Sequence, residues 1–475
     1  MTISEYSEFD GLGLAELVRK GDVTSAELAE ESIARIEKHN PSLNAVVLKL
    51  YDMGRKMAQA PAKGAFQGVP FLLKDAFGDL EGTATRDGSK FRSGNPATKD
   101  STLASRFKKS GIVILGKTNV PEYTLLPTTE SELYGAACNP WNILHSTGGS
   151  SGGAGAAVAA GIVPLAHAND SGGSIRIPAS ACGLVGLKPT RGRNPLGPDF
   201  GDVVAGLCSE HVLTRSVRDC AAMLDSTNGP EIGDPYFAPA IERPYLDELQ
   251  RPAGKLRIAF SLTDPDGKKF HPECVTGVET TAKLLSDLGH EVTEASPPLA
   301  TGEAAGLFLP MWASYLAWEI EAETERRGRP PKDDELQGLT WGFYEIGKTI
   351  SASQFLALRV KAQAMSRRIG LFMQSYDVWL TPTLATPPIK NGMLDLTERD
   401  AVTGFLPLAD YVPFTPIQNL TGQPAISLPL HWSSDGLPIG MMFSAQFGDE
   451  ATLFRLAAQL EQAQPWKDKH PEIWN

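Results

Sequence analysis

The sequence carries two glycine- and serine-rich segments close together, TGGSSGG at residues 147–153 and DSGGSIRIP at residues 170–178. Each segment frames one serine with glycines, Ser150 in the first and Ser174 in the second. Glycine has no Cβ atom, so it allows unusual backbone angles and a close approach of main-chain N–H groups to a ligand. One such segment alone is typical of a turn between a strand and a helix. Two of them, with 24 residues from serine to serine, indicate a site.

The second segment has the composition of a loop that binds an oxyanion. The four consecutive N–H groups of Ser171, Gly172, Gly173 and Ser174 could point into one cavity beside the Ser174 hydroxyl. Such a cavity would hold a nucleophile together with the donors that stabilise a developing negative charge. We therefore expect Ser174 to be a nucleophile and these four residues to form its oxyanion hole.

Two rival interpretations of the glycine-rich segments fit the sequence less well. A phosphate-binding loop would continue into Gly-Lys-Ser or Gly-Lys-Thr, and neither segment does. Residues 148–152 formally fit the G-x-S-x-G pattern of α/β-hydrolases, which would make Ser150 the nucleophile of an esterase. That fold also needs a later acid and histidine. No downstream histidine stands out among His167, His211, His271, His290, His431 and His470.

Further segments extend the pattern from about residue 68 to residue 466. Together with the two glycine-rich segments they resemble the motifs of the amidase signature family, in that family's order. Within the family the chain is most similar to the branch of nylon-oligomer hydrolases, which act on the cyclic dimer of 6-aminohexanoate. The segments are GVPFLLKD at 68–75, GKTNVPE at 116–122, GLVGLKPTRGR at 183–193, NLTGQPAIS at 419–427 and DGLPIG at 435–440.

The resemblance implies a catalytic set. By position, Ser174 matches the family's nucleophile, Ser150 its bridging serine and Lys74 its base, and in such enzymes the bond Gly149–Ser150 is cis. Lys74 follows an apolar run suited to burial, which would populate the neutral form that a base needs. Chemistry of this kind requires no metal and no organic cofactor.

The resemblance also assigns supporting roles. Asp170 and Arg176 would brace the oxyanion loop, and Ser151 would support the catalytic set. The family usually has Gly-Thr-Asp before the second glycine run, whereas this chain has Ala168-Asn169-Asp170. That departure leaves the hydrogen bonding of the loop open.

Contacts to the substrate are expected from Tyr123, Thr124, Leu125 and Ser150. A less securely placed set of aromatic residues would add a pocket wall and make the cavity wide and apolar. That set is Trp312, Tyr315, Trp318, Trp341, Phe343 and Tyr344.

The pattern of apolar residues predicts an α/β fold. We expect a surface helix over 23–40, stopping before Pro41, and short buried strands over 111–116 and 256–261, the latter followed by a helix over 274–288. The family resemblance implies one domain, residues 1–475, with a central mixed twisted sheet covered by helices on both faces. Its signature core would span about 68–225, and a C-terminal part, about 255–466, would complete the sheet and the substrate pocket.

Composition excludes several partners. The net charge of −12 and pI near 5.3 argue against nucleic acid and anionic membranes as binding partners.

The first eleven residues lack the pattern of a signal peptide, and the longest apolar run, 152–166, is too short to span a bilayer. Five scattered cysteines are expected to be free thiols in a reducing compartment, so we expect a cytoplasmic protein. A homodimer is left open.

These observations together predict an amide hydrolase that works through a serine acyl-enzyme. The expected substrates are small molecules: neutral bulky or aryl amides, nylon oligomers or carbamates, the last making the enzyme a urethanase. The alternative with the same catalytic set is the glutaminase subunit of a multi-chain amidotransferase. A catalytically silent binding protein is disfavoured because all three catalytic positions are filled.

Overall fold

Strand β2 (Pro70–Lys74) shows why the centre of this fold is a sheet covered on both sides. In the computed structural model, Leu72 packs into one cluster of buried apolar side chains, while Phe71 and Leu73 pack into another. Successive side chains of a strand point to opposite faces of the sheet, so both faces at β2 must be covered by apolar groups. A strand that is apolar at every position is typical of such a buried sheet.

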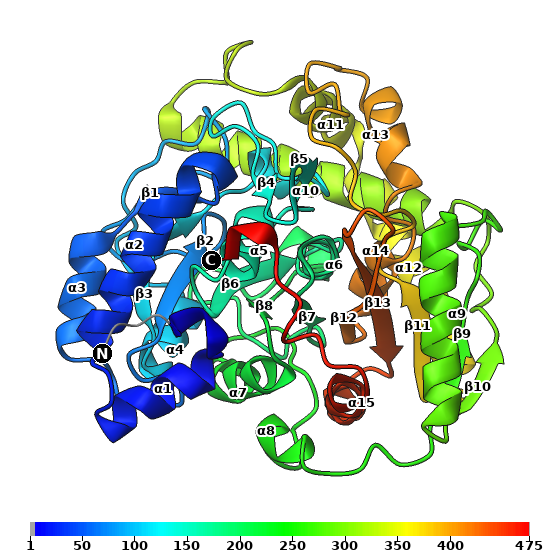
Figure 1. Cartoon of the computed structure of the whole chain (residues 1–475). Helices are drawn as coiled ribbons and strands as arrows, with labels where there is room; N and C mark the ends of the chain where they lie inside the picture. Colours follow the sequence, from blue (N-terminus) through cyan, green and yellow to red (C-terminus); the bar gives the residue numbers. More distant parts are fainter. Residues whose placement is uncertain (1–4, 475) are drawn as a thin grey trace.

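The structure describes residues 5–474, apart from the side chains of residues 406 and 409. Residues 1–4 and 475, which the predicted domain includes, lie outside the described residues. In the described chain one sheet of eleven strands runs through the molecule (Figure 1). In spatial order its strands are β1 (Val46–Lys49), β3 (Val113–Thr118), β2, β6 (Leu165–Asp170), β8 (Ser209–Thr214), β7 (Val185–Lys188), β12 (Ala425–Trp432), β13 (Pro438–Ala445), β11 (Val378–Pro382), β9 (Arg257–Phe260) and β10 (Glu291–Glu294).

The sheet is mixed. Strand β2 runs parallel to β3 and β6, and β9 runs parallel to β10 and β11, whereas the remaining neighbours are antiparallel. The antiparallel pair β7 and β12 joins the strands of the predicted signature core to those of the C-terminal part. The predicted α/β fold with a mixed sheet is therefore confirmed, and the internal boundaries near residues 225 and 255 stay predictions.

Helices cover both faces of the sheet. Helices α2 and α5 pack against β2 and β3 on the side of Leu72, and α6 packs against β7, β12 and β13. Their bounds, with those of the other helices, are α1 (Gly11–Lys20), α2 (Ser25–Leu43), α3 (Tyr51–Gln59), α4 (Thr102–Ser110), α5 (Gly152–Ala159), α6 (Arg176–Cys182), α7 (Val217–Thr227), α8 (Tyr245–Glu248), α9 (Pro272–Asp287), α10 (Glu303–Arg327), α11 (Gly338–Thr349), α12 (Ala352–Phe372), α13 (Ala401–Ala409), α14 (Thr415–Thr421) and α15 (Glu450–Ala463).

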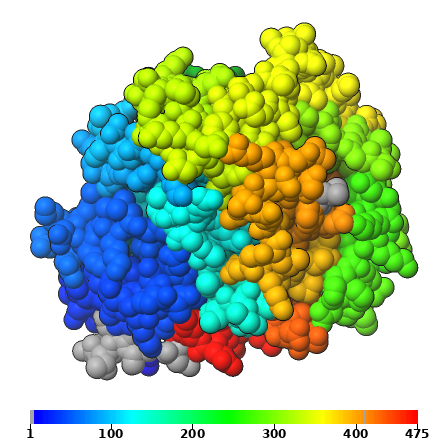
Figure 2. All heavy atoms as spheres, turned by 90° about the horizontal axis from the view of Figure 1, so that it is seen from above, coloured from blue at the N-terminus to red at the C-terminus, as the bar shows by residue number. Residues whose placement is uncertain are grey.

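Helices α10, α11 and α13 form an upper layer beyond the sheet. Helix α11 contacts both α10 and α13, so segments far apart in the sequence meet there. From above, the yellow-green and orange segments lie side by side, next to cyan residues of the N-terminal half (Figure 2). A small hairpin of β4 (Cys138–Asn139) and β5 (Asn142–Ser146) lies outside the main sheet.

The predicted elements over 111–116, 256–261 and 274–288 correspond to β3, β9 and α9, but two boundaries were wrong. Strand β3 starts at Val113 because Gly111, at a φ of 98°, ends helix α4. Helix α2 continues through Pro41 to Leu43, although proline usually ends a helix. Leu43 is fully buried, and Asn44 closes the last turn by donating its N–H to the carbonyl of Asn40.

Because α5 is closely packed, we expect a single added methyl group there to lower the stability of the protein strongly. A Cβ atom added at Gly153 would overlap Asn119 N and lie 2.6 Å from the carbonyl oxygen of Ala45. We expect Gly153→Ala to destabilise the protein by about 1–3 kcal/mol, since overpacking forces backbone shifts. Gly370 in α12 is the matched control, because nothing lies within 4 Å of an added Cβ there. Gly370→Ala should leave the melting temperature unchanged or raise it; equal losses for both variants would contradict the packing argument.

Candidate active site

Lys74 lies at the carboxyl end of β2 and is completely buried. Its Nζ donates to Ser150 Oγ at 2.7 Å and to Asn169 Oδ1 at 2.5 Å. Strand β6, which carries Asn169, runs parallel to β2 as its neighbour, so the carboxyl ends of both strands meet at one edge of the sheet. Ligand sites in α/β sheets form at this edge.

Asn169 was missed as a partner of Lys74 in the sequence, where it stood only as a departure from the family pattern. Its amide nitrogen donates to the carbonyl of Ala76 at 3.3 Å, which fixes the amide oxygen towards the lysine. An amide oxygen only accepts hydrogen bonds, so this contact uses one N–H of Lys74. A neutral amine has two N–H groups and one lone pair, so donation to Asn169 leaves one N–H and the lone pair for the contact with Ser150 Oγ. The signal in the sequence that could have identified this contact is the position of Asn169, next to Asp170 at the end of a strand.

The surroundings of Lys74 favour its neutral form. Burial lowers the pKa of Lys74 to about 7, because the low-dielectric interior destabilises the ammonium ion. The nearby Cys208, Glu210 and Asp87 act in the opposite direction and limit the fall of this pKa. A lysine with a pKa near 7 is poised to accept a proton at neutral pH.

Ser150 is held where β5 leads into α5. The peptide bond Gly149–Ser150 is cis, and Ser150 is 1% exposed. Helix α5 begins directly afterwards and consists only of Gly, Ala and Val, so it packs closely beneath the site. Ser151 is also buried, and its Oγ donates to the carbonyl of Asn169 at 3.3 Å.

Ser174 lies in the short loop between β6 and α6. Gly173 has a φ of 134°, and a Cβ atom there would lie 2.6 Å from Ile177 Cδ1, so only glycine fits. Ser174 is 7% exposed and lines a cavity. Among the described residues, no hydrogen bond joins Ser174 to Ser150, so a proton relay between them stays a prediction.

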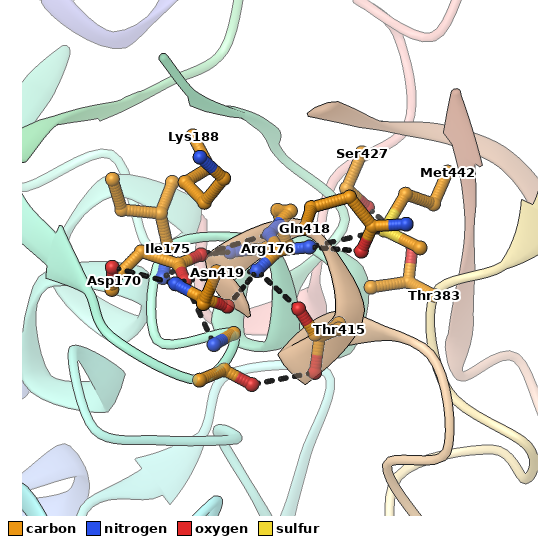
Figure 3. Close-up of polar contacts among 12 residues, drawn as sticks. Asp170, Ile175, Arg176, Lys188, Thr383, Thr415, Gln418, Asn419, Ser427 and Met442 are labelled. Atoms are coloured by element: carbon orange, nitrogen blue, oxygen red, sulfur yellow. Dashed lines mark hydrogen bonds and ion pairs between the residues drawn. The ribbon is translucent and has the colours of Figure 1, made fainter. Parts of the chain in front are cut away.

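The ion pair of Asp170 and Arg176 sits beneath this loop. Both side chains are fully buried, and Arg176 donates through Nε and Nη2 to the two carboxylate oxygens at 2.9 Å each. Arg176 also reaches the carbonyl of Thr415 and the side chains of Gln418 and Asn419 in α14 (Figure 3). Burial would raise the pKa of Asp170, but Arg176 outweighs it and holds that pKa at about 2.

The predicted oxyanion hole is partly engaged by this carboxylate. Gly173 donates its N–H to Asp170 Oδ1 at 2.8 Å, and Ile175 donates its own to Oδ2 at 3.2 Å. In the described chain, the N–H groups of Ser171, Gly172 and Ser174 have no hydrogen-bond partner within the protein. Three of the four predicted donors therefore remain available for an oxyanion.

The cavity beside Ser174 has a volume of about 140 Å³. Apolar side chains make up most of its wall, and four carboxylates, those of Asp264, Asp266, Glu303 and Asp410, also line it. No Lys, Arg or His is among the described lining residues. The predicted contacts Thr124 and Leu125 line this cavity, whereas Tyr123 does not: its phenol is buried and its ring packs against the guanidinium of Arg92.

The aromatic wall expected from the sequence was mostly wrong. Of the six aromatic residues, only Trp312 is among the described residues that line the cavity. Trp318 lines a different cavity, and Phe343 is buried in the main apolar core. Helix α10 is apolar on several sides, so the sequence could not fix which side chains face Ser174. Phe308, one turn before Trp312, and Phe405 of α13 line the cavity and were missed.

The hydrogen-bond partner of Ser150 argues against the α/β-hydrolase interpretation. That partner is Lys74, whereas the nearby His167 accepts the backbone N–H of Lys74 through Nδ1 at 3.2 Å. Within residues 5–474, no cluster of three or more His, Cys, Asp or Glu side chains could hold a metal ion. No helix in the same part of the chain has the length and apolar character needed to cross a bilayer.

Comparisons with known proteins agree with this geometry. The family model described as Amidase matches residues 27–454. The 6-aminohexanoate-cyclic-dimer hydrolase of Pseudomonas sp. (strain NK87) is 41% identical, over 98% of this chain and 97% of that protein. The solved structure of 6-aminohexanoate cyclic dimer hydrolase matches with a TM-score of 0.93 and 38% identity over 99% of each chain. A bacterial aryl acylamidase of the amidase signature family matches with a TM-score of 0.88 and 26% identity over 98% of each chain. The chain therefore belongs to the amidase signature family.

Proposed function

We propose that this amidase hydrolyses amide bonds through a serine acyl-enzyme, with Ser174 as nucleophile, Ser150 as the bridging residue and Lys74 as base. The observation that carries the proposal is the buried contact between Lys74 Nζ and Ser150 Oγ at 2.7 Å. A serine hydroxyl is a poor nucleophile at neutral pH unless a base takes its proton. A lysine kept neutral by burial provides that base.

The reaction would proceed in two steps. Ser174 Oγ attacks the carbonyl carbon while its proton passes to Ser150, and the proton of Ser150 passes to Lys74. The free N–H groups at residues 171, 172 and 174 stabilise the tetrahedral oxyanion. The C–N bond then breaks, and the leaving amine takes a proton from Ser150, which regains one from Lys74. Water attacks the acyl-enzyme by the same route and releases the acid.

The cavity wall supports neutral substrates. Its apolar side chains suit a hydrocarbon or aryl group. Of its four carboxylates, Asp410 pairs with Lys268 and Glu303 pairs with Arg368, whereas Asp264 and Asp266 leave net negative charge that disfavours a substrate carboxylate. Free glutamine carries a carboxylate and would need a basic partner. Lys268 and Arg368 contact carboxylates of this wall, but Asp410 and Glu303 already pair with them, so they are not free cations for the carboxylate of glutamine, which speaks against a glutaminase. Anilides, cyclic nylon-type amides and aryl carbamates are the substrates we propose.

Removing the nucleophile should abolish turnover without unfolding the protein. We expect Ser174→Ala to lower kcat by about 10³-fold or more, because it deletes the covalent step. The melting temperature should stay close to that of the parent, since the change removes only one hydroxyl. A fluorophosphonate probe should label the parent at Ser174. Labelling of the Ser174→Ala variant, or labelling at Ser150, would show that the nucleophile is assigned wrongly.

The activity should depend on the protonation of Lys74. Because the base must be neutral and the pKa of Lys74 is about 7, kcat/KM should rise as the pH increases through about 7. Lys74→Ala should remove this rise together with most of the activity, and EDTA should have no effect.

Lys188 provides the matched control for this pH dependence. It is also fully buried, and burial lowers its pKa to about 7, but its Nζ donates to the carbonyl of Pro189 and not to a serine. Lys188→Met should retain the rise with pH in whatever activity remains. Loss of the rise in Lys188→Met, with its retention in Lys74→Ala, would assign the titration to the wrong lysine.

Substrate preference tests the cavity. The values of kcat/KM for a neutral anilide, an aryl carbamate and free glutamine should be compared at one pH. We expect the anilide or the carbamate to exceed glutamine by about 10²-fold or more, since a carboxylate left unpaired in this cavity loses several kcal/mol. A preference for glutamine would favour the amidotransferase subunit instead.

A further inference from the structure

Phe308 of helix α10 lies against the loop that carries Ser174. Its side chain is 8% exposed and lines the Ser174 cavity. A Cβ atom added at Gly172 would lie 2.6 Å from Cζ of Phe308, and the three atoms nearest to that Cβ all belong to the ring of Phe308. The tip of the ring therefore fills the space that a side chain at residue 172 would need.

This contact lies beside one of the free donors of the predicted oxyanion hole, the N–H of Gly172. The φ of Gly172 is not positive, so the ring, and not the backbone angle, demands glycine at this position. The loop is fixed here, because the hydroxyl of Thr415 donates to the carbonyl of Gly172 at 2.7 Å. A substrate whose carbonyl oxygen binds at the N–H of Gly172 must therefore fit next to Phe308.

The ring of Phe308 is packed in place. Its centroid lies 5.4 Å from that of Trp312, one turn further along α10, and both side chains belong to the main apolar core. Ala305 and Leu309 line the cavity at spacings of three and four residues from this pair, so one face of α10 forms this wall. Side chains packed as closely as in a protein interior leave little room for an additional group.

The cavity receives the acyl part of the substrate, an assignment that rests on the proposed function. In that reaction the leaving amine takes its proton from Ser150 and so lies beside it. Neither Ser150 nor Lys74 is among the described residues that line the cavity, whereas Ser174 and Gly172 are. The group on the other side of the carbonyl carbon, which stays bound to Ser174, therefore extends into the cavity past Phe308.

We propose that Phe308 determines specificity by excluding acyl groups that branch at the atom next to the scissile carbonyl. The preferred class is then amides of straight-chain acids, together with carbamates, in which that atom is an oxygen with a single substituent. Amides of α-amino acids branch at that atom and are excluded. One methyl group in a closely fitting pocket changes kcat/KM by about 10- to 200-fold, which makes the exclusion measurable.

The 4-nitroanilides of propanoic acid and 2-methylpropanoic acid differ by one methyl group at this atom and test the proposal. We expect the parent to prefer the propanoyl compound in kcat/KM by about tenfold or more. Phe308→Ala should bring the two values within about threefold, because it opens the space beside Gly172. A parent without this preference, or a folded variant that keeps it, would overturn the proposal.

Phe405→Ala is the matched control. Phe405 of α13 lines the same cavity, but it supplies none of the three atoms nearest to a Cβ at Gly172. The same truncation there should keep the preference for the propanoyl compound at about tenfold or more, whatever it does to the overall rate. An equal loss of preference in Phe405→Ala would mean that any enlargement of the cavity relaxes specificity, and the role of Phe308 would be refuted.

Phe308→Leu guards against a folding defect, since truncation of a buried phenylalanine to alanine is strongly destabilising. Leucine lacks the ring tip that reaches Gly172, so it should weaken the preference in the same direction. Circular dichroism and the melting temperature identify which of the two variants is folded. An undiminished preference in folded Phe308→Leu would count against the proposal as it does in Phe308→Ala.

Binding separates this proposal from the proposed reaction. Calorimetric titration of Ser174→Ala with the two anilides measures the preference without turnover. We expect the propanoyl compound to bind more tightly, and Phe308→Ala to remove the difference when it is added to Ser174→Ala. This result, combined with a parent that hydrolyses neither compound, would refute the proposed reaction alone. Equal binding of the two compounds, or no saturable binding of either, would refute the role of Phe308.

Discussion

The buried ion pair between Asp170 and Arg176 is the interaction on which the arrangement of the site depends. Asp170 ends strand β6, Arg176 begins helix α6, and the loop with Ser174 lies between them. Two charges removed from water are tolerated only when hydrogen bonds satisfy all their polar groups, and removing one partner typically costs about 3–5 kcal/mol. Here the backbone of the loop and helix α14 supply those hydrogen bonds. The same contacts that stabilise the charges therefore fix the position of Ser174.

Two buried ionisable side chains of the site, Asp170 and Lys74, differ in their charge state. Asp170 is kept ionised by the guanidinium of Arg176, whereas burial lowers the pKa of Lys74 to about 7, and its hydrogen-bond partners at Nζ are neutral. An ionised carboxylate suits a structural role, and a neutral amine suits a base. Environment, more than residue type, separates the two functions.

The sequence predicted the fold class, the mixed sheet and the family, because these rest on alternating apolar patterns and on motifs spread over the whole chain. It also named Lys74 and Ser150, which the structure places in contact. It did not predict which side chains form the cavity wall. Packing against distant segments decides which face of an apolar helix such as α10 points into the cavity. It missed Asn169 as a partner of Lys74, since that contact depends on which strands are neighbours. The end of α2 was wrong because burial of Leu43 outweighs the usual effect of Pro41.

The pairing of β7 with β12 has a consequence for synthesis on the ribosome. These strands are separated by more than 230 residues, and helix α14, which completes the partners of Arg176, directly precedes β12. A growing chain that ends before residue 415 has made the complete loop with Ser174 but none of the side chains that satisfy Arg176 from α14. Until α14 has been synthesised, Arg176 therefore lacks the carbonyl of Thr415 and the side chains of Gln418 and Asn419 as acceptors. We therefore expect the loop with Ser174 to take its final position only when most of the chain has been made.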